Sequence, residues 1–298
     1  MRLTVRVPAT SANLGPGYDS FGLALDLCNE VTVDTDAEPG VTWEGEGSEE
    51  LPTDGTDMIS RAMAFVAAHA SFAGSSSALP LVRLPLPPVR LHGKNRIPLE
   101  RGLGSSSAAA VAGVMLAHRV LDLADPDAHT IFRLAAEFEG HPDNAAPAVF
   151  GGFTIALGNS AVQRLDTHPD VRPVLLIPEL RLATSTAREV LPATVPMHAA
   201  VSNIAHAALA VVALTRDPSL LATALVDRIH QPYRLPLVPA VREVFDDLVA
   251  EGIPVCVSGA GPTLLAFDRP DRSVPDPGPG WRTLRPALRA AGAGFVEA

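Results

Sequence analysis

The chain has 298 residues, of which 47% are hydrophobic, and it carries a formal charge of −10 at pH 7. This length allows one large or two medium domains with a substantial core, and the hydrophobic content excludes a disordered chain. The acidic balance argues against nucleic acid as a partner, because that affinity rests largely on Lys and Arg that neutralise phosphates. Any polyanionic ligand must therefore be held locally.

The two cysteines, Cys28 and Cys256, lie within apolar runs and form no Cys-x-x-Cys pair. We expect two buried thiols, and neither a disulfide framework nor a zinc site. The first eight residues alternate as in a strand instead of resembling a signal peptide. No window approaches the run of about eighteen uncharged apolar residues that spans a membrane. We therefore expect a cytoplasmic chain without a membrane partner.

The first predicted elements are two strands separated by a polar loop. Alternating hydrophobicity predicts strands at residues 3–7 and 21–33, with turn-rich residues 8–20 between them. A polar loop so close to a core strand indicates a site. Residues 40–57 are acidic and glycine-rich and should form a hairpin or surface loop, and helical spacing predicts a helix at 58–72.

A small-residue and proline-rich stretch follows at residues 75–98. Its prolines exclude a long central strand and leave two short edge segments, at residues 81–84 and 89–91. Helices are expected from residue 105 to about residue 121 and at residues 128–139.

Gly151 and Gly152 precede a strand expected at residues 153–157, and we place the domain boundary there, between residues 1–152 and 153–298. Further along the chain we expect strands at residues 174–177, 254–258 and 263–267, helices at residues 199–214, 220–229 and 239–251, and a last helix and strand after residue 281. A glycine turn joins two of these strands, as in a β-hairpin. Hairpins and helices in irregular order favour the α+β class over a doubly wound sheet.

Residues 98–112 form the stretch around which the chain is organised. Gly102 and Gly104 allow a tight turn, and the serines that follow are good N-caps for an alanine-rich helix. The first N–H groups of such a helix are unpaired and attract phosphate. A Gly-Ser loop that only caps a buried helix is the alternative, and the surrounding motifs favour the phosphate site.

Common phosphate and nucleophile motifs are absent. Lys94 is the only lysine and is followed by Asn95, which excludes the Gly-Lys-Ser/Thr loop and the protein kinases. Ser107 occupies the place of the third glycine of a dinucleotide fingerprint. Neither Ser105 nor Ser106 has an adjacent histidine that could activate a hydrolase nucleophile.

Residues 98–108 resemble the ATP-binding motif of the GHMP kinases. Residues 8–22 are similar to the substrate motif of the homoserine kinase branch of this family, and residues 258–263 to the family's third, glycine-rich motif. Further matches to that branch lie at residues 139–152, 184–192 and 231–234. Chance is a poor explanation for matches that follow the family order from residue 8 to residue 263.

The resemblance implies a two-domain GHMP kinase fold, with a ribosomal protein S5 domain 2-like N-terminal domain, a ferredoxin-like C-terminal domain and an active site in the cleft between them. It implies a homodimer that uses ATP and Mg²⁺ and phosphorylates the side-chain hydroxyl of L-homoserine. Another kinase of the family, acting on an isoprenoid alcohol or a sugar, and a non-catalytic regulatory relative are the alternatives.

The resemblance also implies the residues that hold Mg·ATP. The expected ATP ligands are Pro98, Gly102, Leu103, Gly104, Ser105, Ser106 and Ser107. Mg²⁺ prefers oxygen ligands and keeps several waters, so one hydroxyl and one carboxylate suffice, and these would be Ser106 and Glu139. Taken alone, Ser106 is better explained as a helix cap and Glu139 as a solvated helix end, and the surrounding motifs favour the metal-binding role.

An amino-acid substrate brings a carboxylate, which arginine recognises bidentately, and Arg188 and Arg234 stand in matching motifs. Asn13 and Asp19 would address the other polar groups of the substrate, although Asn13 could equally bond its own backbone in a turn. The remaining expected substrate ligands are His141, Asn144, Thr184, Gly259 and Gly261.

Asp143 completes the expected catalytic residues, with Ser106 and Glu139. In related mevalonate kinases an Asp acts as general base, and Asp143 lies near the equivalent place. Direct transfer without a protein base is the alternative. Residues 57–59 read Asp-Met-Ile, where relatives often have Asn-Leu-Ile near the adenine, so no adenine contact is assigned there.

Overall fold

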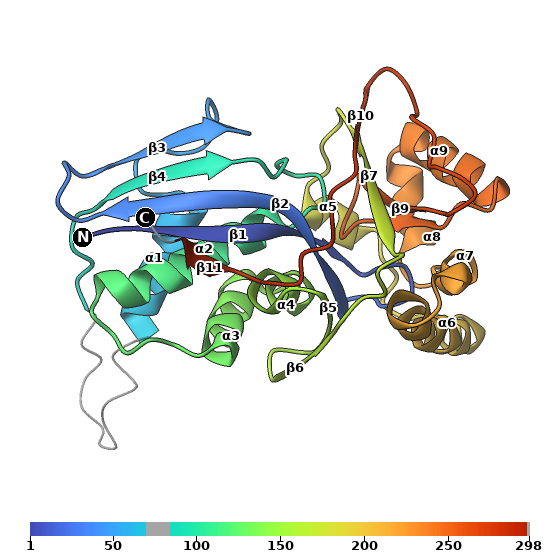
Figure 1. The fold of residues 1–298 in the computed structure, drawn as a ribbon, viewed down its shortest axis with the longest axis horizontal. Helices are drawn as coiled ribbons and strands as arrows, with labels where there is room; N and C mark the ends of the chain where they lie inside the picture. The colour runs from blue at the N-terminus through green and yellow to red at the C-terminus, as the bar shows by residue number, and fades with distance from the viewer. Residues whose placement is uncertain (70–83, 297–298) are drawn as a thin grey trace.

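The structure is a computed structural model that describes residues 1–69 and 84–296. Its larger sheet has seven strands, in the order β11-β1-β2-β4-β3, with β5 and β6 attached through β2. These strands are β1 (Arg2–Ala12), β2 (Phe21–Asp34), β3 (Gly40–Gly45), β4 (Arg90–Asn95), β5 (Phe153–Leu157), β6 (Ala161–Leu165) and β11 (Gly294–Val296). One face of this sheet is covered by the helices α1 (Met58–His69), α2 (Ser105–Val120), α3 (Ala128–Glu139) and α4 (Pro142–Phe150) (Figure 1).

The core of this half forms between the sheet and the helices. Val5 and Val7 of β1 are fully buried, as alternation predicts for a strand with one covered face. Almost every residue of α2 after its first turn is buried, because this helix packs against α1, α3 and the sheet. A Cβ on Gly113 would lie 2.6 Å from the Cβ of Ala62, so α1 and α2 can approach closely only with glycine there.

The smaller sheet, on the right in Figure 1, has the order β10-β7-β9-β8, with all neighbours antiparallel. Its strands are β7 (Arg172–Pro178), β8 (Val255–Val257), β9 (Leu264–Asp268) and β10 (Trp281–Leu284). The helices of this half are α5 (Thr184–Glu189), α6 (Met197–Thr215), η2 (Pro218–Leu220), α7 (Leu221–Ala224), α8 (Gln231–Arg234), η3 (Leu235–Leu237) and α9 (Pro239–Ala250). The arrangement is ferredoxin-like, with residues 269–280 as a loop in place of the second helix.

Several sequence predictions are confirmed with nearly the same bounds. They include the α+β class, β2, β5, β7, the β8–β9 hairpin, α2, α3, α6 and α9. Helix α3 begins after Asp127, whose carboxylate accepts the N–H of Thr130, and ends at Gly140 in the left-handed region. Both cysteines are buried thiols.

The expected turn at residues 8–20 is too long at its start. Strand β1 continues to Ala12 and pairs with β2, and a shift of register between Pro8 and Ala9 accommodates the proline. Strand β4 was expected at an edge but lies between β2 and β3. This is possible because all the prolines of the stretch precede Arg90, so the strand itself contains no proline. The segment expected at residues 81–84 and the end of the helix expected at 58–72 lie largely outside the described residues.

The helix expected at residues 220–229 ends at Ala224 as α7, because Asp227 instead accepts backbone N–H groups at the start of α8. Helix α4 was not predicted. It contains two prolines, of which Pro142 stands at the first turn, where proline is tolerated. Within residues 84–296 no helix follows Trp281, and the chain forms β10 and β11 instead.

The domain boundary expected after Gly152 falls inside the larger sheet. Strand β5 pairs with β2, and β6 pairs with β5. Strand β11 returns from the far end of the chain to pair with β1, which brings the two termini close together (Figure 1). The smaller sheet begins only with β7.

The expectation that no segment approaches a membrane span is wrong for α6. In the part of the chain that the structure describes, α6 is the one helix whose length and composition would allow it to span a membrane. Its most apolar 18 residues have a mean hydropathy of 1.6, and 28% of them are buried. Asn203 in the middle of α6 is buried and donates to Asp227, so a polar bond anchors the helix to the smaller half.

Candidate active site

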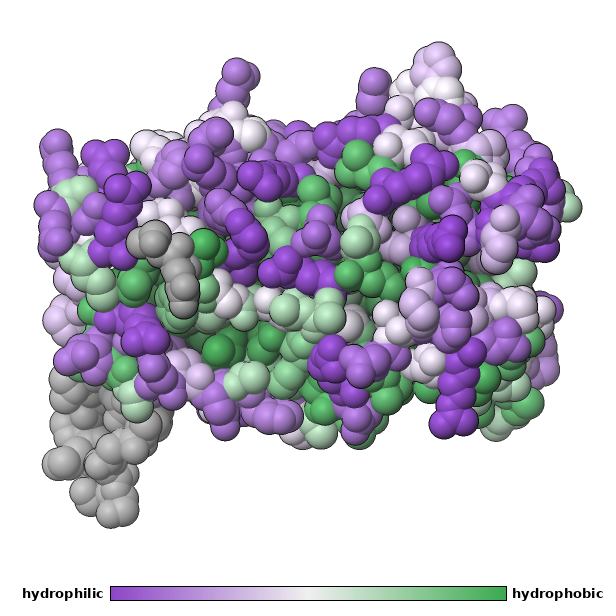
Figure 2. All heavy atoms as spheres, in the orientation of Figure 1, coloured by the Kyte–Doolittle hydropathy of each residue, from purple (hydrophilic) through white to green (hydrophobic). Residues whose placement is uncertain are grey.

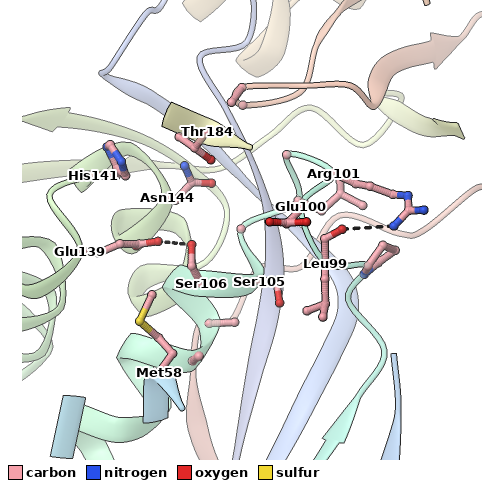
Figure 3. A pocket seen from close by; sticks show the side chains of 18 of the residues that line it. Met58, Leu99, Glu100, Arg101, Ser105, Ser106, Glu139, His141, Asn144 and Thr184 are labelled. Carbon is pink, nitrogen blue, oxygen red and sulfur yellow. Dashed lines mark hydrogen bonds between the residues drawn. The ribbon is translucent and has the colours of Figure 1, made fainter. Parts of the chain in front are cut away.

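A pocket of about 490 Å³ lies where the two halves meet. The N-terminal half contributes Gly102, Ser106 and Glu139 to its lining, and the C-terminal half contributes Arg188 and Arg234. The two helix termini with Ser106 and Glu139 face the segment of Thr184 across this space (Figure 3). Most of the residues predicted for the site therefore come together.

The loop before α2 is held by its neighbours. Gly104 has φ 68° and precedes the helix without a side-chain cap, so the first N–H groups of α2 are open to a ligand. A Cβ on Gly102 would lie 2.2 Å from the carbonyl oxygen of Ser258. The Ser258 hydroxyl donates to the Gly102 carbonyl at 2.7 Å and so joins the third motif to the loop. The geometry suits a phosphate cradle.

Glu139 faces this helix N-terminus (Figure 3). The hydroxyls of Ser106 and Ser107 each donate to one of its carboxylate oxygens. The surrounding protein removes the carboxylate from water and raises the pKa of Glu139 to about 6. Ser107 is fully buried and is not part of the pocket lining, so its place among the ATP ligands stays a prediction.

Ser106 and Glu139 fit a magnesium ion by their chemistry. A hydroxyl and a carboxylate next to a phosphate cradle are hard oxygen ligands, and Mg²⁺ takes its other ligands from water and phosphate. Residues 1–69 and 84–296 contain no cluster of three His, Cys, Asp or Glu that would hold a metal alone.

The opposite wall carries Arg188. Its Nη2 donates to Asp19 Oδ1 at 3.0 Å and to His141 Nδ1 at 2.8 Å. Because a guanidinium only donates, His141 Nδ1 accepts, and burial together with the Arg188 charge lowers the pKa of His141. The buried Nε of Arg188 has no partner among the described residues. An orphaned charged donor of this kind suits an anionic ligand.

Arg234 is only 4% exposed although it lines the pocket. Its Nε donates to the Ala187 carbonyl at 3.2 Å, and its Nη1 to the Gly259 carbonyl at 3.1 Å. Its guanidinium carbon lies 5.5 Å from the centre of the Tyr18 ring. Burial lowers the pKa of Arg234, but a guanidinium stays charged near neutral pH.

Asn13, which was predicted to bind substrate, lines the pocket and also joins two segments of the chain. The Asn13 amide donates to the Gly259 carbonyl at 2.7 Å and accepts the N–H of Asp19 at 2.9 Å, so it ties the N-terminal loop to the third motif. Gly261 lies in the turn after Gly259 and does not line the pocket. Asn144 does line it, and its Oδ1 accepts the Thr10 hydroxyl at 2.8 Å.

Asp143 lies at the pocket wall and is only 3% exposed. Burial, followed by the negative charges of Asp19 and Glu139, raises the pKa of Asp143 to about 7. A carboxyl with this pKa can accept or release a proton near neutral pH.

The raised pKa of Asp143 makes this residue a cost to stability at neutral pH. The folded-state pKa of about 7 exceeds the ordinary 3.8, so the fold favours the protonated acid. The contribution of protonated Asp143 to the free energy of unfolding is therefore full below pH ~4 and is lost as pH rises through 7. Asp143→Asn is therefore expected to increase the free energy of unfolding by about 2 to 4 kcal/mol at pH 8. Urea unfolding measures this, and the gain should shrink toward pH 4. The exposed control Asp247→Asn should show no such gain, and an equal gain at both pH values would contradict the account.

The sequence missed part of the pocket lining. Asn29 lies on β2, and its Oδ1 accepts the N–H groups of Arg96 and Ile97 at 2.7 and 3.0 Å. Asp57 caps α1 and lines the pocket with Met58, although no ligand contact was assigned there. The other missed lining residues include Trp43, Leu51, Asn95, Leu99 and Arg181. Asn29 is a polar residue within an apolar strand, and this could have marked it as a candidate site residue from the sequence.

Comparison with known proteins gives a consistent result. The family model described as GHMP kinases N terminal domain matches residues 59–152, and the model described as GHMP kinases C terminal matches residues 205–275. A homoserine kinase from Streptomyces avermitilis is 42% identical over 98% of this chain and 95% of its own length. A homoserine kinase from Clavibacter michiganensis is 43% identical over 89% of this chain and 82% of its own.

Solved structures share the fold. Homoserine kinase from Cytophaga hutchinsonii has a TM-score of 0.79, with 23% identity over 99% of this chain and 97% of its own. Phosphomevalonate kinase from Streptococcus pneumoniae, solved with phosphomevalonate and AMPPNP, has a TM-score of 0.65 and 13% identity over 90% and 93% of the two chains. Because enzymes with different substrates share this architecture, the substrate must be argued from the pocket.

Proposed function

The chain belongs to the GHMP kinase family, and from this premise we propose that it transfers the γ-phosphoryl group of ATP to the side-chain hydroxyl of L-homoserine. It is an ATP-dependent kinase. The product would be O-phospho-L-homoserine, an intermediate of threonine biosynthesis.

Two arginines in the pocket support the assignment of an amino-acid substrate. Arg188 and Arg234 both line it, and each has a guanidinium nitrogen without a hydrogen-bond partner among the described residues. Two such donors suit the carboxylate of an amino acid. Asp19 on the same wall can pair with its ammonium group. A neutral sugar such as galactose has no carboxylate that could pair with these arginines.

The N-terminal half would hold the nucleotide. The N–H groups at the start of α2 would bind its phosphates, and Ser106 and Glu139 would hold Mg²⁺, which neutralises the charge of the transferred group. Positioning the substrate hydroxyl against the γ-phosphate then supplies most of the remaining rate enhancement. Asn144 and His141 line the pocket beside this point and can orient the hydroxyl.

Asp143 is the proposed acceptor of the hydroxyl proton. It lines the pocket, and its pKa of about 7 suits proton transfer. The alternative is that the hydroxyl proton passes directly to the phosphate. An unchanged kcat in Asp143→Asn would support this alternative.

The proposal is tested by ADP release from Mg·ATP with L-homoserine, mevalonate and galactose offered separately. We expect turnover with L-homoserine alone. Turnover only with another alcohol would overturn the substrate assignment, and ATP binding without turnover on any of the three would favour a regulatory role.

We also propose that the enzyme is a cytoplasmic homodimer that associates through α6. Met197, Val201 and Ile204 are 78%, 58% and 70% exposed on one face of this helix. No charged residue lies between Glu189 and Arg216. In Figure 2 hydrophobic residues lie at the lower right, where Figure 1 places α6. A charged partner surface would be desolvated against this face, whereas a second copy offers the same uncharged face across a twofold axis.

Ile204→Asp is expected to convert the dimer to a monomer, because two aspartates would face each other in an apolar contact. Light scattering after size-exclusion chromatography measures the mass. Leu157→Asp, at a residue 64% exposed on the larger sheet, is the matched control and should remain dimeric. A dimer that survives Ile204→Asp would exclude this face.

A further inference from the structure

Behind the substrate side of the pocket, α8 begins in a buried polar network. The side chain of Asp227 accepts the N–H groups of His230 at 2.9 Å and Gln231 at 2.7 Å. Its other oxygen accepts the Asn203 amide at 2.8 Å. These bonds fix the start of α8 and with it the backbone of His230 and Arg234.

The ring of His230 is 0% exposed and bridges two groups. Its Nε2 lies 2.9 Å from the Gly15 carbonyl oxygen, and its Nδ1 lies 3.2 Å from Nη1 of Arg234. A carbonyl only accepts and a guanidinium only donates, so Nε2 carries the hydrogen and Nδ1 accepts. Burial lowers the pKa of His230 to about 4, and the ring is neutral at neutral pH.

Three bonds hold the guanidinium of Arg234. Two of the acceptors are the backbone carbonyls of Ala187 and Gly259, and the third is the His230 ring. Its hydrogen bonds within the described residues come from Nε and Nη1, which leaves Nη2 as the donor available to the pocket. His230 is the only one of the three acceptors that is a side chain, and it does not line the pocket.

We propose that His230 is a positioning residue for the substrate carboxylate, which holds Arg234 so that Nη2 meets that carboxylate. The inference rests on the proposed function, because it requires an amino-acid substrate. A protonated ring could not accept from Arg234, and an apolar side chain would leave both Nη1 and the Gly15 carbonyl short of a partner.

Two substitutions test the roles of the two ring nitrogens one at a time. In His230→Asn the amide oxygen can replace Nδ1 and accept from Arg234, whereas in His230→Gln the amide nitrogen can replace Nε2 and donate to Gly15. We expect His230→Gln to raise the KM for L-homoserine about 10- to 100-fold, with kcat and the KM for ATP unchanged. His230→Asn should show the smaller increase.

A substrate analogue separates positioning from a general loss of structure. In 2-amino-1,4-butanediol a hydroxymethyl group replaces the carboxylate, so its inhibition constant as a competitor of L-homoserine should not change in His230→Gln. His118→Gln is the control, because His118 is also a buried histidine outside the pocket lining. It should leave both constants unchanged.

An unchanged KM for L-homoserine in His230→Gln, or an equal weakening of both ligands, would overturn the positioning role. Wild-type protein that fails to phosphorylate L-homoserine would instead overturn the proposed function, so the two failures are distinguishable.

Discussion

Arg234→Met is expected to lower kcat/KM for L-homoserine by about 10²- to 10³-fold, mainly through KM. Arg234 is buried, and a substrate carboxylate that loses this partner would be desolvated with only Arg188 as a counter-charge. Steady-state kinetics with varied L-homoserine at saturating Mg·ATP measures the effect.

The matched control is Arg242→Met, at an exposed arginine of α9 that pairs with Asp246. It should leave kcat/KM unchanged. Calorimetric binding of Mg·ATP to Arg234→Met should also be unchanged, which separates loss of the substrate site from loss of the fold. An unaltered KM in Arg234→Met would contradict the assignment of the carboxylate site.

Glu139→Gln is expected to lower kcat by about 10²- to 10³-fold, because an amide cannot supply the negative charge that holds Mg²⁺ beside the transferred phosphate. The carboxylate also confers a pH dependence. Its pKa is about 6, so protons compete with the metal and the affinity for Mg·ATP should fall as pH drops below 6. Titration of Mg·ATP binding between pH 5 and 8 measures this.

Glu137→Gln, on the same helix but exposed and outside the pocket lining, is the control and should behave as the wild type. The Mg·ATP affinity of Glu139→Gln should be low and independent of pH across this range. A wild-type pH profile retained in Glu139→Gln would show that another group titrates.

The elements that the sequence predicts well are those whose signals are local. Helix α3 has a capping Asp127 and a terminal Gly140, and α2 follows two glycines with a long apolar run, so both can be read without tertiary information. The motifs around Gly102, Glu139 and Arg234 likewise predicted residues that lie around one pocket.

The elements that the sequence predicts poorly depend on distant partners. Pro8 lies in a strand only because the register shifts opposite it, and β4 is central only because β3 pairs with it in parallel. The hydrogen bond from the Asn13 amide to the Gly259 carbonyl, 246 residues away, cannot be predicted from the loop sequence alone. The role of His230 depends on Gly15 and Arg234 together.

Phosphorus NMR of the product formed from Mg·ATP and L-homoserine tests directly whether the enzyme phosphorylates the side-chain hydroxyl. We expect a phosphomonoester on the side-chain oxygen. At L-homoserine concentrations below the wild-type KM it should be formed by the wild type and be nearly absent with Glu139→Gln and Arg234→Met. A phosphorylated product with any other alcohol but none with L-homoserine, or equal product from all three proteins, would contradict this expectation.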